Sequence, residues 1–84
     1  MNLTIARCRD EAGGLTCDAP EEVPLGAELI LESMREPWRV VVVRVVALHR
    51  GPELDLSRSA FERIGHLNEA GACVRWRRMG GMAP

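Results

Sequence analysis

The 84-residue sequence contains no lysine, glutamine or tyrosine, so all 11 of its basic residues are arginine. This usage is typical of coding bias in a GC-rich genome, and it also suits a chain that relies on ion pairs. The formal net charge is −1. A nearly neutral chain offers no electrostatic basis for binding nucleic acid or an anionic membrane, and we disfavour both as partners.

Long hydrophobic runs are also absent. The longest, residues 40–48, is interrupted by Arg44 and falls well short of the roughly 20 apolar residues that a membrane-spanning helix needs. The N-terminal segment lacks the basic region and long apolar core of a secretory signal peptide. We therefore expect a protein without a signal peptide, made in the cytoplasm, unless an export signal lies outside this sequence.

The cysteines are too few for a disulfide scaffold. Cys8, Cys17 and Cys73 are odd in number and have no CxxC spacing. Cys8 and Cys17 could pair across a loop, but we favour isolated buried thiols. Zinc ligation together with His49 or His66 is disfavoured because the spacing does not match a zinc site. The sequence predicts no metal and no cofactor.

The pattern of apolar residues predicts one β-rich domain over residues 1–80, followed by a tail at 81–84. Apolar content of 46% is ordinary for a folded chain. Strands are predicted at residues 2–9, 26–33, 40–46, 54–56 and 72–79, with a brief extended piece at 15–17.

Two segments of the chain allow more specific predictions. The valine-rich strand at 40–46 is apolar on both faces, which predicts burial on both sides. Residues 18–24 are predicted to be a loop, because two prolines and three acids leave little for a hydrogen-bonded ladder.

A short helix is predicted over residues 58–64. Ser57 is a good N-cap, Ala60, Phe61 and Ile64 form an apolar stripe, and Gly65 is the expected stop. One short helix among several strands indicates an all-β, barrel-like class.

Residues 54–65, LDLSRSAFERIG, resemble the "DLS…AF…IG" signature of the expansin and rare lipoprotein A superfamily. Three weaker matches follow the family order: the VRV and RGP at 43–45 and 50–52, the VRWR at 74–77, and the LT and VPLG at 15–16 and 23–26. The resemblance implies a small double-psi β-barrel of five to six strands with a short helix near 58–64.

Two departures from the family pattern qualify this resemblance. The family's first strand, with a G-x-A-(T/S)-(W/Y)-Y pattern, has no counterpart upstream of Asn2. The acid that the family places before the Gly-Pro turn is also missing from residues 46–49. The first departure predicts a barrel with an open side, to be covered by residues 15–25 or by a second chain.

Four residues are candidates for a binding site. The resemblance aligns Asp55 with the acid that expansins keep in their groove, although bracing the turn before the helix is an equally good role. His49 lies near the missing acid and could titrate near neutral pH, or be a solvated loop histidine. Trp38 and Trp76 could stack on sugar rings or serve as buried anchors. Of the four, only Asp55 is a candidate catalytic residue.

The remaining charged groups have a plain interpretation and a sharper one. The acids of the loops, including Asp18, are interpreted as solvated. Arg75, Arg77 and Arg78 form a basic edge that is either a solvated face or a contact for a wall phosphate or an acidic partner.

We expect a non-catalytic barrel module, a structural or binding component of a larger assembly such as a bacteriophage particle or a cell-wall complex, with a protein partner or self-association. One alternative is a peptidoglycan-acting lytic or wall-loosening protein that uses Asp55. The other is a stand-alone domain that binds peptidoglycan or another polysaccharide.

Overall fold

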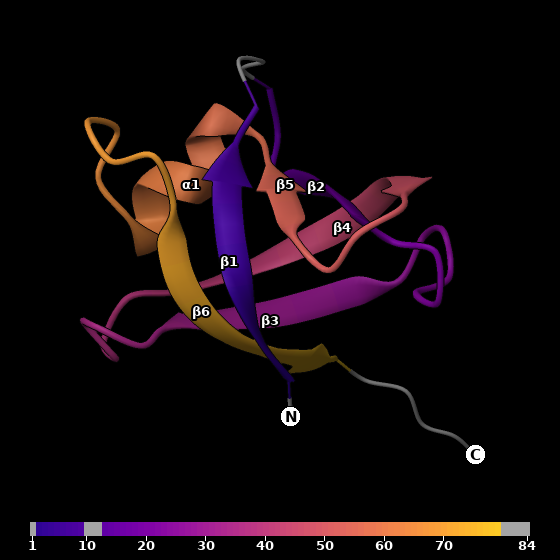
Figure 1. Cartoon of the computed structure of the whole chain (residues 1–84), viewed down its shortest axis with the longest axis horizontal. Helices are drawn as coiled ribbons and strands as arrows, with labels where there is room; N and C mark the ends of the chain where they lie inside the picture. Colours follow the sequence, from indigo (N-terminus) through magenta and orange to yellow (C-terminus); the bar gives the residue numbers. More distant parts are fainter. Residues whose placement is uncertain (1, 10–12, 80–84) are drawn as a thin grey trace.

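A computed structural model of the chain describes residues 2–9 and 13–79. Within these residues, six strands close into a barrel with the order β1-β5-β2-β4-β3-β6, accompanied by one helix (Figure 1). This confirms the predicted all-β class and the single short helix. The elements are β1 Asn2–Cys8, β2 Thr16–Pro20, β3 Glu28–Ser33, β4 Val40–His49, β5 Leu54–Leu56, α1 Arg58–Ile64 and β6 Ala72–Arg78.

The barrel is closed by strands that are distant in sequence. β1 pairs with β5 in parallel and with β6 in antiparallel fashion, and β2 pairs with β4 in parallel. The prediction of an open side is therefore wrong. The strand from Asn2 to Cys8 already fills the position between β5 and β6, so the barrel is complete without a strand upstream of it.

The prediction that residues 18–24 form only a loop is wrong for their first part. β2 contributes Asp18 to ladders with both β4 and β5. Cys17 and Ala19 are small, face inward and are fully buried. Pro20 is tolerated because it stands at the end of the strand, where a missing N–H interrupts little of the ladder.

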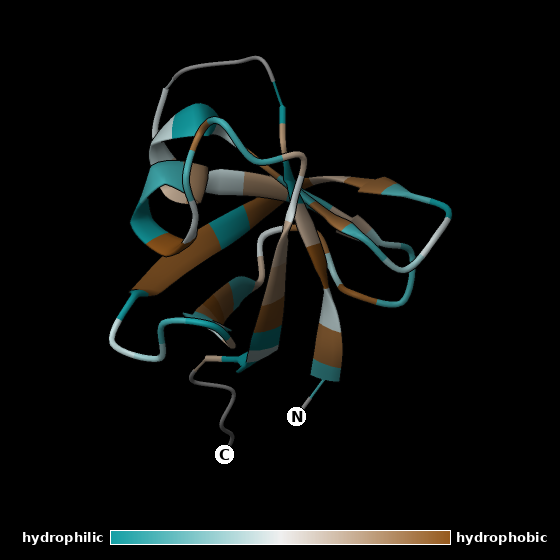
Figure 2. Ribbon diagram, turned by 60° about the vertical axis from the view of Figure 1, so that its left-hand side comes forward, coloured by the Kyte–Doolittle hydropathy of each residue, from teal (hydrophilic) through white to brown (hydrophobic). Residues whose placement is uncertain are grey.

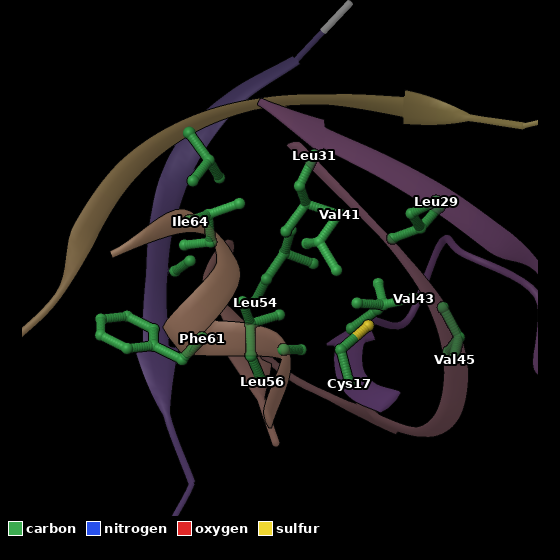
Figure 3. Close-up of a cluster of buried hydrophobic side chains, with 14 of the residues drawn as sticks. Cys17, Leu29, Leu31, Val41, Val43, Val45, Leu54, Leu56, Phe61 and Ile64 are labelled. Carbon is green, nitrogen blue, oxygen red and sulfur yellow. The ribbon is translucent and has the colours of Figure 1, made fainter. Parts of the chain in front are cut away.

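The interior of the barrel holds one hydrophobic cluster (Figure 3). Every second residue of β4 points into it: Val41, Val43 and Val45 are at most 3% exposed, while Val40 and Val46 are 42% and 48% exposed. The prediction that β4 is buried on both sides is therefore wrong. Each strand of a closed barrel has one inner and one outer face. Brown and teal bands both occur along the strands in Figure 2, but apolar residues stand on the outer faces too, so hydropathy alone does not separate the two faces.

The helix α1 packs on β4 near one end of the barrel, and its predicted boundaries are confirmed. Ser57 Oγ accepts a hydrogen bond from the backbone N–H of Ala60 at 3.3 Å, as an N-cap should. Gly65 ends the helix in an extended conformation with φ −150°. Glycine leaves space for the neighbouring ring, because a Cβ would lie 3.0 Å from Cζ of Phe61 and would require that ring to shift. In the described part of the chain, no helix has the length and apolarity to cross a membrane.

Candidate functional site

A charged cluster lies on the outer face of β1 and β5. Leu54 and Leu56 point into the core, so Asp55 between them points outward. The parallel register places Arg7 beside Asp55. Arg7 Nε donates to Asp55 Oδ1 at 2.8 Å and Arg7 Nη2 donates to Oδ2 at 3.2 Å. The hydrogen bond and charge of Asp55 raise the pKa of Arg7. Both carboxylate oxygens of Asp55 are thus held by one guanidinium.

Asp18 extends this cluster onto β2. It stands directly opposite Asp55 in the antiparallel ladder. Arg9 Nη1 donates to Asp18 Oδ1, and Arg9 Nη2 donates to Thr16 Oγ1 at 2.8 Å. The interpretation of Asp18 as a solvated loop acid is wrong, since it belongs to the sheet and its side chain is 25% exposed. The alternation of apolar and polar residues at Cys17, Asp18 and Ala19 was a signal of a strand, but the neighbouring proline and acids obscured this signal.

His49, at the end of β4, joins the same cluster. Its Nδ1 lies 2.7 Å from the carbonyl oxygen of Arg50, which makes Nδ1 the donor. Its Nε2 lies 3.6 Å from Asp55 Oδ2, is buried, and has no hydrogen-bond partner within residues 2–9 and 13–79. The structure thus places His49 against Asp55 and not in a solvated loop.

A groove of about 870 Å³ adjoins the cluster at the end of the barrel where β1 begins and β6 ends. Its walls are the first residues of β1, the loop after β2, the turn after β4 and the last residues of β6. The groove is lined by Asn2, Leu3, Thr4, Pro20, Glu21, Glu22, Val23, Pro24, His49, Arg50, Gly51, Pro52, Trp76, Arg77 and Arg78. His49 belongs to both the groove and the charged cluster, and it connects the two.

The edge of β1 contributes to this groove. β5 pairs only with the second half of β1, from Ala6 to Cys8, whereas β6 pairs with residues 2–6. The turn after β4 lies beside the first half of β1, where Thr4 Oγ1 donates to the carbonyl oxygen of Pro52 at 2.6 Å. A depression remains where the sheet is not continued by a strand.

The two tryptophans lie at different places. Trp76 is partly buried, packs against the core and lines the groove. Trp38 is 76% exposed and precedes β4, whereas His49 ends that strand. A ten-residue strand is roughly 30 Å long, so Trp38 is remote from the groove. Of the four predicted site residues, the structure brings together Asp55, His49 and Trp76, and it leaves Trp38 apart.

The cysteines are free thiols with different environments. Cys17 is fully buried, and this burial raises its pKa to about 12. Its thiol therefore stays protonated at neutral pH. Cys8 is half-buried and Cys73 is exposed, so the prediction of buried thiols is wrong for Cys73. Residues 2–9 and 13–79 contain no group of three or more His, Cys, Asp or Glu side chains able to hold a metal ion.

Comparison with solved structures places this barrel among the expansin-like folds. The crystal structure of an expansin from Clavibacter michiganensis superposes with a TM-score of 0.76 and 17% sequence identity, covering 98% of this chain and 52% of the expansin. An Asp→Asn mutant of an expansin from the same organism, in complex with cellohexaose, superposes with a TM-score of 0.75 and 16% identity, at the same coverage. The chain therefore spans about half the length of these expansins. No protein-family model and no curated protein sequence matches it. The fold is an expansin-like double-psi β-barrel, as the sequence resemblance implied.

Proposed function

We propose that this barrel is a glycan-binding, wall-associated module without hydrolytic activity, and that its ligand lies in the groove. The observation that carries the proposal is the groove of about 870 Å³, which combines the ring of Trp76 with the polar side chains of Thr4 and His49. Cavities of roughly 300–1,000 Å³ are typical of small-molecule sites.

The chemistry of this lining suits a sugar chain. A pyranose ring has an apolar face that stacks on an aromatic side chain, and hydroxyl groups at its rim that need hydrogen-bond partners. The groove provides an indole, a hydroxyl, an imidazole and several guanidinium and carboxylate groups. The Clavibacter michiganensis expansin in complex with cellohexaose supports a polysaccharide as the ligand class.

Binding without cleavage is favoured by the ion pair between Asp55 and Arg7. Glycoside hydrolysis needs a carboxylic acid to protonate the leaving oxygen, and a second carboxylate as base or nucleophile. Both oxygens of Asp55 accept hydrogen bonds from Arg7, and Asp55 is not among the residues that line the groove. The groove itself, with Trp76 and His49, remains open to a ligand.

Titration with cellohexaose is expected to change the fluorescence of Trp76 and not that of Trp38. Trp38→Phe leaves Trp76 as the sole tryptophan, and Trp76→Phe leaves Trp38, so each variant reports on one site. We expect a saturable change in the fluorescence of the Trp38→Phe protein. In the Trp76→Phe protein we expect no change in fluorescence and an affinity about threefold weaker, because a phenyl ring offers a smaller stacking face than an indole.

Calorimetry on the unmodified protein would check the affinity independently of fluorescence. A response confined to the variant that retains Trp38 would contradict placement of the ligand in the groove. Absence of binding to cellohexaose, to other β-glucans and to peptidoglycan would contradict the function itself.

A second candidate function, cleavage of a wall polysaccharide, is favoured by one observation. Asp18 and Asp55 stand directly opposite each other on adjacent antiparallel strands. The Cβ atoms of such a pair lie about 4.5–5.5 Å apart, and retaining glycosidases hold their two carboxyl groups about 5–5.5 Å apart. Each carboxylate is held by its own arginine, however, which makes cleavage the second candidate.

Asp55→Asn separates the two candidates. If the module only binds, the unmodified protein releases no soluble sugar from peptidoglycan or cellulose above background. The variant then binds cellohexaose within about threefold of the unmodified protein, as for a residue outside the stacking site. Glu62→Gln is the matched control, since it removes the same charge from an exposed position on α1, outside the groove and the charged cluster. Sugar release by the unmodified protein that Asp55→Asn abolishes would establish the enzyme instead.

A role as a part of a bacteriophage particle or another assembly is the weaker proposal. It depended on an open barrel side that a partner would cover, and closure by β1 removes that physical reason. Self-association stays a prediction, to be checked by light scattering on the purified chain.

A further inference from the structure

We propose that the groove selects acidic glycans, whose sugars carry carboxylate or phosphate groups, over neutral ones. The inference rests on the proposed glycan-binding function and concerns the three arginines of the lining, Arg50, Arg77 and Arg78. Arg50 lies in the turn after β4. Arg78 is the last residue of β6, and Arg77 is the residue before it.

Most arginines elsewhere on the described barrel are paired with acids. Six of them lie within 4.0 Å of a carboxylate: Arg7, Arg9, Arg35, Arg39, Arg44 and Arg75. Two arginines of β6 show the contrast directly. Arg75 is bound by Glu32 on β3, whereas Arg77 lies beside the apolar Ile30 of the same strand.

The guanidinium groups of Arg50, Arg77 and Arg78 have no such partner within residues 2–9 and 13–79, and all three side chains are exposed. An arginine fork with free donors recognises carboxylate and phosphate oxygens in a bidentate manner. Three unpaired forks around one groove therefore favour a ligand with regularly spaced anionic groups.

Two acids of the same lining limit where those groups can lie. Glu21 and Glu22, in the loop after β2, also line the groove and are exposed. Neither makes an ion pair with the three arginines within the described residues. An acidic glycan would turn its anionic groups toward the arginines and its hydroxyl groups toward the glutamates.

Two glycans with the same linkage test this selectivity. Cellohexaose is the neutral probe, and a β-1,4-linked hexaglucuronate is the acidic one, differing by a carboxylate on each sugar. Binding of each is measured by calorimetry at low and high salt. We expect the hexaglucuronate to bind about tenfold more tightly at about 20 mM NaCl, and the difference to shrink to about twofold at about 0.5 M NaCl, where exposed charges are screened.

The variants Arg77→Gln and Arg78→Gln locate the effect. Each is expected to remove most of the preference for hexaglucuronate while leaving cellohexaose affinity nearly unchanged. Arg63→Gln is the matched control, because it removes the same charge from an exposed position on α1, at the other end of the barrel. A poly(glycerol phosphate) oligomer as a third ligand distinguishes phosphate from carboxylate as the preferred anion.

The outcomes are separable. Equal affinity for the two hexasaccharides would overturn the selectivity and leave the glycan-binding function standing. A preference that Arg63→Gln reduces as much as Arg77→Gln would also overturn it, because the effect would then come from net charge. Failure of every glycan to bind would overturn the proposed function, and this inference with it.

Discussion

Phe61→Ala is expected to lower the free energy of unfolding by about 3–5 kcal/mol, the usual cost of removing a large buried aromatic side chain. Phe61 is fully buried and is the largest side chain in the core. It anchors α1 to the barrel, and Gly65 has no Cβ where its ring lies. Natural domains are stable by only about 5–15 kcal/mol, so the variant should be close to unfolding at room temperature.

Urea denaturation followed by circular dichroism would measure this loss. Phe61→Leu is the graded control, because it keeps most of the apolar volume and should cost clearly less than the alanine variant. If Phe61→Ala cost less than about 1 kcal/mol, the helix would not be anchored to the core as the structure places it.

Ser57→Ala is expected to lower the free energy of unfolding by about 2–4 kcal/mol, which is large for loss of a single oxygen atom. Ser57 is fully buried. Its Oγ donates to the carbonyl oxygen of Gly14 at 2.8 Å and accepts from the backbone N–H groups of Thr16 and Ala60, each at 3.3 Å. The substitution removes the N-cap of α1 and also leaves buried backbone groups without partners.

Ser59→Ala is the matched control for this substitution. Ser59 lies two residues further along, within α1, and is partly exposed. Its replacement should change stability by no more than about 0.5 kcal/mol. Equal effects of the two serine substitutions in thermal and urea unfolding would contradict the role assigned to the Ser57 hydroxyl.

The contacts of Ser57 also affect the candidate site. Ser57 follows β5 directly and its hydroxyl bonds to the chain at the start of β2, so one side chain joins the strands that carry Asp55 and Asp18. Loosening this junction should disturb the register that places the two carboxylates opposite each other. Substitutions at Ser57 are therefore expected to affect the charged cluster more than those at Phe61, for a given loss of stability.

The sequence by itself determined the elements whose signals are local. The helix at Arg58–Ile64 follows from its N-cap, its apolar stripe and its terminal glycine, all within ten residues of each other. The strands β3, β5 and β6 follow from alternation over a few residues. The motif at residues 54–65 also carried the resemblance to the expansin-like barrel, and the fold confirmed it.

The tertiary structure decided everything that depends on which strands are neighbours. Burial of β4 on one face only follows from barrel closure, and no pattern within β4 reveals it. The same holds for β2, whose prolines and acids conceal a strand until β4 and β5 flank it.

The candidate site depends on the same long-range pairing. Asp55 meets Arg7, 48 residues away, only because β1 lies parallel to β5 in that register. The turn after β4 brings His49 to the groove that Trp76 lines, and the length of β4 keeps Trp38 away from it. Local propensity specifies the type of each element, whereas register and closure are set by burying the inner faces of all six strands together, a property of the whole barrel.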